Sequence, residues 1–155
     1  MAIWQFSFVM VPEEKIANIL GSNIEGSMTK HNEELMSWKG YCIKEGSLVE
    51  ISKVLAPTKS WADNIKQYGV IDESCLELYY EEDEVIEISV RLDLRSLSKD
   101  ILEAIVSFIK VNKGMISTKN GNLIKPTVDD ILSVIKTTDA YRFVKEPEEF
   151  VRSIK

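Results

Sequence analysis

Histidine and cysteine are scarce in this chain, whose 155 residues include one histidine and two cysteines. The histidine, His31, lies in the polar stretch TKHNEE without a nucleophile pattern beside it, so a histidine-dependent catalytic triad has no basis in the sequence. The cysteines, Cys42 and Cys75, form no CxxC motif and have no clustered histidines, so a zinc centre or a dithiol redox site lacks ligands. We therefore expect a surface histidine and two reduced, buried thiols.

Glycine-rich motifs are also missing. The sequence contains no GxGxxG, no GxxxxGKS/T and no GxSxG, so a phosphate-binding loop and a hydrolase nucleophile elbow have no sequence support. The acidic run 82–84 lacks the alternating ligands and the central glycine of an EF-hand loop. The sequence accordingly predicts no cofactor and no metal site, and it predicts a protein that is not an enzyme.

Long apolar runs are absent as well. The N-terminal stretch MAIWQFSFVMVPEEK lacks a basic region and a small-residue cleavage site, and its apolar part is too short and too alternating for a signal peptide or a membrane span. We therefore expect a cytoplasmic protein that does not bind membranes. A chain of this length can bury one core. Because no repeat or linker divides it, we expect residues 1–155 to form a single domain.

Basic residues are missing from one segment, residues 67–90. Eight of the chain's 25 acidic residues lie there, which leaves 17 acidic and 19 basic residues in the rest of the chain. The formal net charge of -6 therefore originates in this segment. Such a local negative field repels the phosphates of nucleic acids and attracts basic partners. The alternative is that the acidic residues only keep a hairpin soluble and protect a sheet edge from association.

The segment VIEISVRLDLRS, residues 85–96, alternates apolar and polar residues without interruption. This pattern predicts a strand with one face in the core and one polar face. The strand follows the similar stretch CLELYY, so the two predict the clearest hairpin of the chain. Their core residues align if the loop has three residues, which we place at 82–84. This register predicts three pairs on the polar face: Tyr79 opposite Glu87, Glu77 opposite Ser89, and Cys75 opposite Arg91.

Alternation and end signals predict the other elements. Strands are expected at 2–11 and 47–55, and Ser98 and Thr127 are expected to be the N-caps of two amphipathic helices. The pair Asn120-Gly121 predicts the turn of a second hairpin, with both residues at positive φ. Because hairpins connect the strands, we expect an α+β fold in which an antiparallel or mixed sheet has helices packed mainly on one face.

The polar face of the strand at 85–96 carries a cluster of charge. Asp93 lies two residues from Arg91 and two residues from Arg95. An acid flanked by two guanidinium groups has a lowered pKa, which suits an ion pair or an anion clamp better than a general base. A structural ion-pair ladder is the favoured interpretation, a platform for a ligand or partner is the second, and a catalytic acid or base is the least favoured.

Trp61 lies in a predicted loop just before the acidic segment. Tryptophans in loops often anchor protein interfaces, and Ser60 can cap a turn that presents this one. Packing of the ring into the core from the loop is nevertheless the favoured interpretation, and an exposed interface anchor is the second.

The later part of the chain contains a recognisable series of features: Ser60-Trp61, Tyr68-Gly69, the hairpin that ends in RLDLR at 91–95, a helix, a small hairpin, Pro126, and the terminal stretch DAYRFVKEPEEFV. This series resembles small bacterial immunity proteins of polymorphic toxin systems. The resemblance implies a cytoplasmic binder that neutralises a toxin by covering its active site or another essential surface. It assigns no functional residues, because the class contains many unrelated folds.

These observations predict a non-enzymatic protein-binding module, of the immunity-protein kind, that neutralises a basic toxin through an acidic hairpin at 72–87. The predicted partner-binding residues are Glu77, Glu81, Glu82, Asp83, Glu84, Glu87 and Trp61. One alternative is a small-ligand or anion-binding domain that uses Arg91, Asp93 and Arg95 on the polar face of the strand. A second alternative is a structural homo-oligomer with this polar strand at the subunit interface.

Overall fold

A computed structural model describes residues 2–20 and 35–153 of the chain. The helices and strands of this part are, in chain order, β1 (Gln5–Pro12), α1 (Glu13–Leu20), α3 (Glu45–Ser52), β2 (Pro57–Thr58), β3 (Ile65–Gly69), β4 (Cys75–Glu81), β5 (Glu84–Asp93), α4 (Lys99–Val111), β6 (Gly114–Thr118), β7 (Leu123–Ile124), α5 (Val128–Ile135), α6 (Asp139–Lys145) and α7 (Pro147–Ser153). No helix among the described residues has the length and apolar character needed to cross a membrane.

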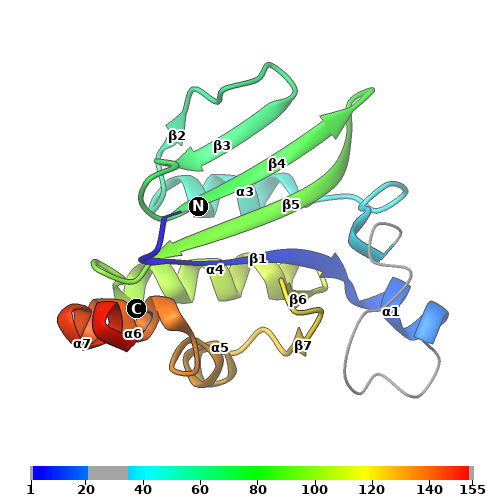
Figure 1. Cartoon of the computed structure of the whole chain (residues 1–155). Coiled ribbons are helices and arrows are strands. Elements are labelled where there is room, and N and C mark those ends of the chain that lie inside the picture. The colour runs from blue at the N-terminus through cyan, green and yellow to red at the C-terminus, as the bar shows by residue number, and fades with distance from the viewer. Residues whose placement is uncertain (1, 21–34, 154–155) are drawn as a thin grey trace.

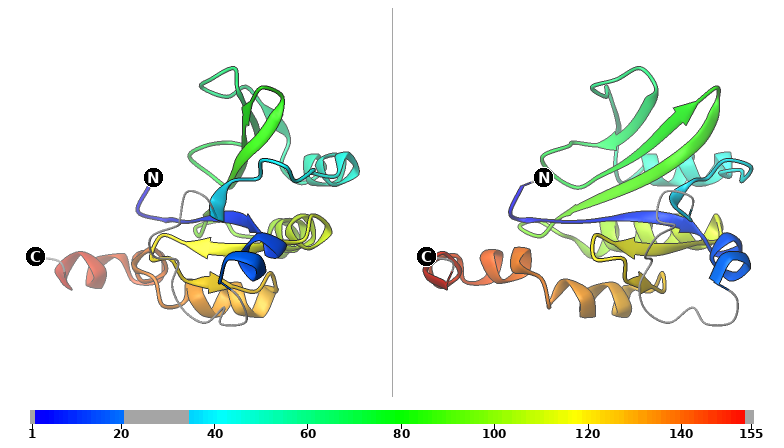
Figure 2. Two further views of the ribbon diagram at one scale, coloured as in Figure 1. Left: turned by 90° about the vertical axis from the view of Figure 1, so that its right-hand side faces the viewer. Right: turned by 45° about the vertical axis from the view of Figure 1, so that its right-hand side comes forward.

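The strands form one antiparallel sheet in the order β2-β3-β4-β5-β1-β6-β7, with β5 at its centre (Figure 1). Apolar side chains of β1, β4 and β5 point to one face, where they pack with side chains of α3, α4 and α5 in the main core. A second, smaller apolar cluster is formed by Val11, Ile16 and Leu35. Figure 2 shows α3 and α4 on the same side of the sheet. The predicted α+β class, with helices mainly on one face, is therefore confirmed.

The other face of the sheet, here called the polar face, carries the residues between those of the core. Its central part consists of Ser7 on β1, Cys75, Glu77 and Tyr79 on β4, Glu87, Ser89 and Arg91 on β5, and Ser117 on β6. The three pairs predicted for the hairpin are all present, with Tyr79 opposite Glu87, Glu77 opposite Ser89, and Cys75 opposite Arg91. Alternation alone determined this part of the register, because each face of the hairpin has its own environment.

The turn of this hairpin differs from the prediction. Glu81 pairs with Glu84, so the loop has two residues, and the register shifts between Tyr79 and Tyr80. The shift leaves Ile86 as the additional residue of a β-bulge on β5. With a two-residue loop alone, the core residues of β4 would lie opposite the polar residues of β5. The bulge corrects this alignment, which a three-residue loop was expected to do. The carbonyl oxygen of Ile86 accepts a hydrogen bond from the backbone N–H of Trp38 at 3.1 Å.

The prediction of a strand at 47–55 is wrong. Residues 47–52 belong to the helix α3, and residues 53–55 form the turn that follows it. Buried or partly buried apolar residues recur at Leu48, Ile51 and Leu55, a spacing of three and four that fits one helix face. Val49 and Val54 lie on the opposite side and are exposed, so the apolar run combines two helix faces. The helix packs against α4.

The elements after β5 follow the prediction more closely. Ser98 caps α4, because its side chain accepts a hydrogen bond from the Ile101 N–H. Thr127 caps α5, because its side chain accepts a hydrogen bond from the Asp130 N–H. The hairpin of β6 and β7 turns at Lys119, Asn120 and Gly121, and among these residues only Gly121 has a positive φ, of 78°. The expected two-residue turn with Asn120 also at positive φ is thus replaced by a three-residue turn that ends in a left-handed glycine.

Candidate functional site

The turn between β4 and β5 presents four consecutive exposed carboxylates, those of Glu81, Glu82, Asp83 and Glu84, which we call the acidic turn. Glu82 and Asp83 have φ angles of 49° and 66°. This left-handed region is unfavourable for a glutamate, by roughly 1–2 kcal/mol. Figure 1 shows the end of the hairpin extending beyond α3 and α4, so these carboxylates lie at a projecting end of the molecule.

Trp61 lies in the loop that borders the acidic turn. The Tyr80 N–H donates to the Asn64 carbonyl at 2.8 Å, and the Asn64 side-chain amide donates to the Tyr80 carbonyl at 3.3 Å. These bonds attach the loop between β2 and β3 to the end of β4. Trp61 in that loop is 70% exposed, which corrects the favoured sequence interpretation that its ring packs in the core. The structure therefore brings Trp61 and the acidic turn to the same end of the sheet.

Two further acidic residues of the predicted hairpin lie on the polar face instead. Glu77 is fully buried, because β4 lies between β3 and β5 and places it between Gln67 and Ser89. This burial corrects its assignment to the partner-binding surface. Glu87 is half-buried, and its burial raises the pKa of its carboxyl, as does the nearby Glu77 carboxylate to a smaller extent.

Glu77 is the least satisfied polar side chain in the described part of the chain. Neither of its carboxylate oxygens accepts a hydrogen bond from a described residue. Its one ion-pair partner there is Arg91, whose Nη2 lies 3.8 Å from Oε1, beyond hydrogen-bond distance. A buried carboxylate without donors is costly, so the Arg91 guanidinium is drawn toward β4.

The predicted platform of Arg91, Asp93 and Arg95 is not one site. Asp93 is buried and accepts two hydrogen bonds from the Arg95 guanidinium, at 2.9 Å from Nε and 2.8 Å from Nη2. These bonds from Arg95 hold the pKa of the Asp93 carboxyl below its usual range. Arg95 also lies over the ring of Trp4, 4.0 Å from its centroid. The pair is a structural ion pair at the end of β5, and Arg91 lies separately beside Glu77.

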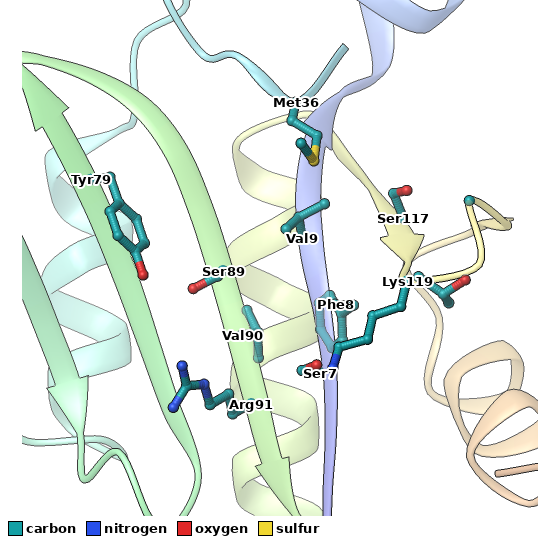
Figure 3. Close-up of a pocket in the computed structure, with 12 residues that line it drawn as sticks. Ser7, Phe8, Val9, Met36, Tyr79, Ser89, Val90, Arg91, Ser117 and Lys119 are labelled. Carbon is teal, nitrogen blue, oxygen red and sulfur yellow. The ribbon is translucent and has the colours of Figure 1, made fainter. Parts of the chain in front are cut away.

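A hollow of about 420 Å³, here called the sheet hollow, lies on the polar face over β1, β4, β5 and β6 (Figure 3). The described polar residues that line it are Arg91, Lys119, Ser7, Ser89, Ser117, Thr118 and Tyr79. Tyr79 forms a hydrogen bond with Ser89, and burial raises the pKa of its phenol. Arg91 was a predicted site residue, and Tyr79 and Ser89 were predicted on the polar face but not as site residues. Ser7, Ser117 and Lys119 were not assigned to any site.

The residues that sequence reasoning missed come from separate elements. Ser7 lies on β1, Ser117 on β6, and Lys119 in the turn that follows β6. A single strand pattern identifies only the residues of that strand, and strand order decides which others join them. The one available signal was alternation in β1, which already placed Ser7 on a polar face.

We expect the two cysteines to differ strongly in reactivity. Cys75 is buried, and this burial, aided by the Glu77 carboxylate, raises the pKa of its thiol to about 11. Cys42 is exposed, which corrects the prediction that both thiols are buried. At pH 8, iodoacetamide should alkylate Cys42 at least about a hundredfold faster than Cys75, because the thiolate is the nucleophile.

In a Cys42→Ser variant only Cys75 can react, so its alkylation rate is measured alone. Unfolding in urea should restore the full reactivity of Cys75. Two equally fast rates in the folded protein would contradict the burial of Cys75.

Comparisons with protein-family models, with curated proteins and with solved structures return no match for this chain. His31, predicted to be a surface residue, lies outside the described residues. Within the described ranges, no three His, Cys, Asp or Glu side chains group closely enough to hold a metal ion. The acidic turn with Trp61 and the sheet hollow are the two candidate sites of the described residues.

Proposed function

We propose that this protein is a non-enzymatic binding module of the cytoplasm that recognises a basic protein through the acidic turn and Trp61. The observation that carries the proposal is a 70% exposed tryptophan in a loop that is hydrogen-bonded to the end of β4, where four exposed carboxylates follow. This combination is typical of a protein interface, where an aromatic anchor supplies apolar contact area and charges select the partner.

The arrangement is unfavourable for the isolated protein, which supports a binding role. Four neighbouring carboxylates repel one another, and Glu82 occupies a strained backbone region. A basic partner relieves the repulsion and accelerates association through electrostatic attraction. Nucleic acid is a poor partner for the same surface, because its phosphates are repelled.

The resemblance to immunity proteins of polymorphic toxin systems specifies the proposal further. Toxins that cleave nucleic acid are basic because they bind phosphates, so a protein with an acidic projecting end can occupy the same surface. The proposed action is occlusion of the toxin, with no chemical step on this chain. Trp61 would then supply the desolvated anchor, and the acidic turn would steer the encounter.

The test uses a variant that removes charge and keeps the backbone, composed of Glu81→Gln, Glu82→Gln, Asp83→Asn and Glu84→Gln. Asparagine tolerates the left-handed conformation of residue 83. A control variant carries the same change of net charge elsewhere on the surface, with glutamine at the exposed positions Glu14, Glu45, Glu146 and Glu148. Affinity capture with tagged wild type first identifies a partner, and surface plasmon resonance then measures its association and dissociation rates.

We expect the association rate of the acidic-turn variant to fall about tenfold at low ionic strength, and the difference to shrink at high salt. Trp61→Ala should mainly raise the dissociation rate. The control variant should retain most of the wild-type association rate. An acidic-turn variant that associates as fast as wild type would refute the electrostatic part, and a captured partner without basic character would refute the proposed partner class.

A further inference from the structure

The donors around the sheet hollow are largely unused by the protein. The hydroxyls of Ser7 and Ser117 and the ammonium of Lys119 have no hydrogen-bond or ion-pair partner within the described ranges. Arg91 has a single such partner there, Glu77 at 3.8 Å, and its side chain is 27% exposed. Around one concave surface the structure thus holds two cationic groups and two hydroxyls with free donor capacity.

These side chains are held by rigid parts of the fold. Ser7 and Arg91 are directly paired across β1 and β5, and Ser117 is paired with Val9 across β1 and β6. Lys119 lies in a tight turn whose closing residue is left-handed, and Figure 3 shows its side chain extending across β1 above Ser7. Because strands and a tight turn fix the backbone at these positions, binding of a ligand has to order only the side chains.

The chemistry of the lining selects an anion. Among the residues that the structure describes, no aspartate or glutamate lines the hollow, although the chain carries a net charge of -6. Guanidinium, ammonium and hydroxyl groups all donate hydrogen bonds, and the strongest acceptors for charged donors are carboxylate and phosphate oxygens. Phosphate offers three terminal oxygens in a tetrahedral array, which suits donors that approach from several strands.

The size and shape of the hollow indicate more than a bare phosphate ion. Its volume of about 420 Å³ lies in the range of small-molecule sites, about 300–1,000 Å³. Val9 and Met36 lie at one end, away from Arg91, with the ring of Tyr79 at the side (Figure 3). One end of the hollow is therefore apolar and the other is cationic.

We propose that the sheet hollow binds a small organic phosphate monoester, with the phosphate on Arg91, Lys119 and Ser7 and a compact apolar or aromatic group toward Val9 and Met36. This inference does not depend on the proposed protein partner, because the acidic turn and Trp61 are not part of the hollow. It retains Arg91 from the ligand platform predicted by sequence and replaces Asp93 and Arg95, which pair with each other.

Isothermal titration calorimetry of the full chain in a phosphate-free buffer tests this site with three probes: phenyl phosphate, inorganic phosphate and benzoate. We expect phenyl phosphate to bind once per chain and more tightly than the other two. Lys119→Ala should weaken this binding about tenfold, the loss expected for one charge-assisted hydrogen bond. The control Lys125→Ala removes an exposed lysine that does not line the hollow, and it should bind like wild type.

Arg91→Lys keeps a positive charge near the buried Glu77 and removes the guanidinium fork, so it should fold and still bind phenyl phosphate about tenfold more weakly. Absence of saturable binding at millimolar phenyl phosphate would overturn the site. Equal binding of benzoate and phenyl phosphate would overturn the choice of phosphate, and undiminished binding by both variants would place the ligand elsewhere. None of these outcomes depends on the acidic-turn variant, so the two proposals fail separately.

Discussion

Replacing Trp38 by alanine is expected to lower the free energy of unfolding by about 4 kcal/mol, the usual cost of deleting a buried large aromatic side chain. Trp38 is 1% exposed. Its indole N–H donates to the Met10 carbonyl oxygen at 2.8 Å, and its ring meets that of Tyr41 edge-on, with 6.2 Å between the centroids. The substitution leaves a cavity and also removes the donor for the Met10 carbonyl.

The position of Trp38 in the fold explains the size of this effect. Its backbone N–H binds the bulge residue Ile86 of β5 and its side chain binds β1, so one residue holds the two central strands and the segment before α3 together. Domains of this size are stabilised by about 5–15 kcal/mol in total, so a loss of about 4 kcal/mol is a large fraction of the stability of the protein.

Urea denaturation at pH 7, followed by circular dichroism, measures the change for Trp38→Ala. Trp61→Ala is the matched control, because the same side chain is deleted from an exposed position, and its effect should stay within about 0.5 kcal/mol. A loss of less than about 1 kcal/mol in Trp38→Ala would show that the indole does not hold these elements together.

Sequence alone predicted the parts of this fold that depend on a local periodic pattern. The alternation in β5 assigned Ile88, Val90 and Leu92 to the core, and all three are buried. It also gave the cross-strand pair of Glu77 and Ser89, because one face of each strand is apolar and a slipped register would expose it. Helix caps were equally local, since an N-cap needs only its own next three residues.

Local patterns failed where two environments meet within a short segment. The apolar run at 47–55 has residues on opposite helix faces, some buried and some exposed, which gives it the continuous apolar character of a strand. The turn at Glu82 and Asp83 lacks the glycine or asparagine that marks a two-residue loop, and the bulge at Ile86 has no sequence signature.

The candidate sites were harder to predict than the fold because they depend on strand order. Neighbouring charges in the sequence suggested that Arg91, Asp93 and Arg95 form one cluster. The structure pairs Asp93 with Arg95, as in the favoured ion-pair interpretation, but places Arg91 beside Glu77. Lys119 joins Arg91 at the sheet hollow because β1 lies between β5 and β6, an arrangement that no single segment encodes. The acidic turn was placed correctly at an exposed position, since charge runs are generally exposed, whereas the favoured core packing of Trp61 was wrong.

Replacing Asp93 by asparagine is expected to lower the free energy of unfolding by about 2 kcal/mol at pH 7, the range for hydrogen bonds to charged groups. Asp93 is 2% exposed. Its carboxylate accepts both hydrogen bonds from the Arg95 guanidinium and a third from the backbone N–H of Arg95, at 3.0 Å. Asparagine keeps one oxygen for the backbone bond, but its amide cannot accept from the second guanidinium nitrogen. Because the Arg95 side chain is 46% exposed, water partly solvates it in the variant and limits the loss.

The same ion pair determines how this stabilisation varies with pH. The pKa of Asp93 is lowered in the folded protein, chiefly by the hydrogen bonds from Arg95, so the folded state holds this proton less tightly than the unfolded state does. Its contribution is therefore fully present above the unfolded pKa of about 4 and is lost as the pH falls through the folded value. The pKa of Glu87 is raised in the folded protein, so its contribution to stability has the opposite pH dependence. That contribution is present at low pH and is lost as the pH rises above the usual pKa range of a glutamate.

Urea denaturation of wild type and Asp93→Asn at pH 7 and pH 3 should thus show a difference in free energy of unfolding that is smaller at pH 3 than at pH 7. The matched control is Asp139→Asn, which removes an exposed carboxylate that also pairs with an arginine, Arg142. It should cost at most about 0.5 kcal/mol at pH 7, since exposed pairs contribute little. If the Asp93→Asn difference were equal at both pH values, a polar contact independent of ionisation would hold the end of β5. If instead the difference diminishes in acid, the ionised Asp93 fixes Arg95, and Arg91 is the only arginine of this strand free to serve the sheet hollow.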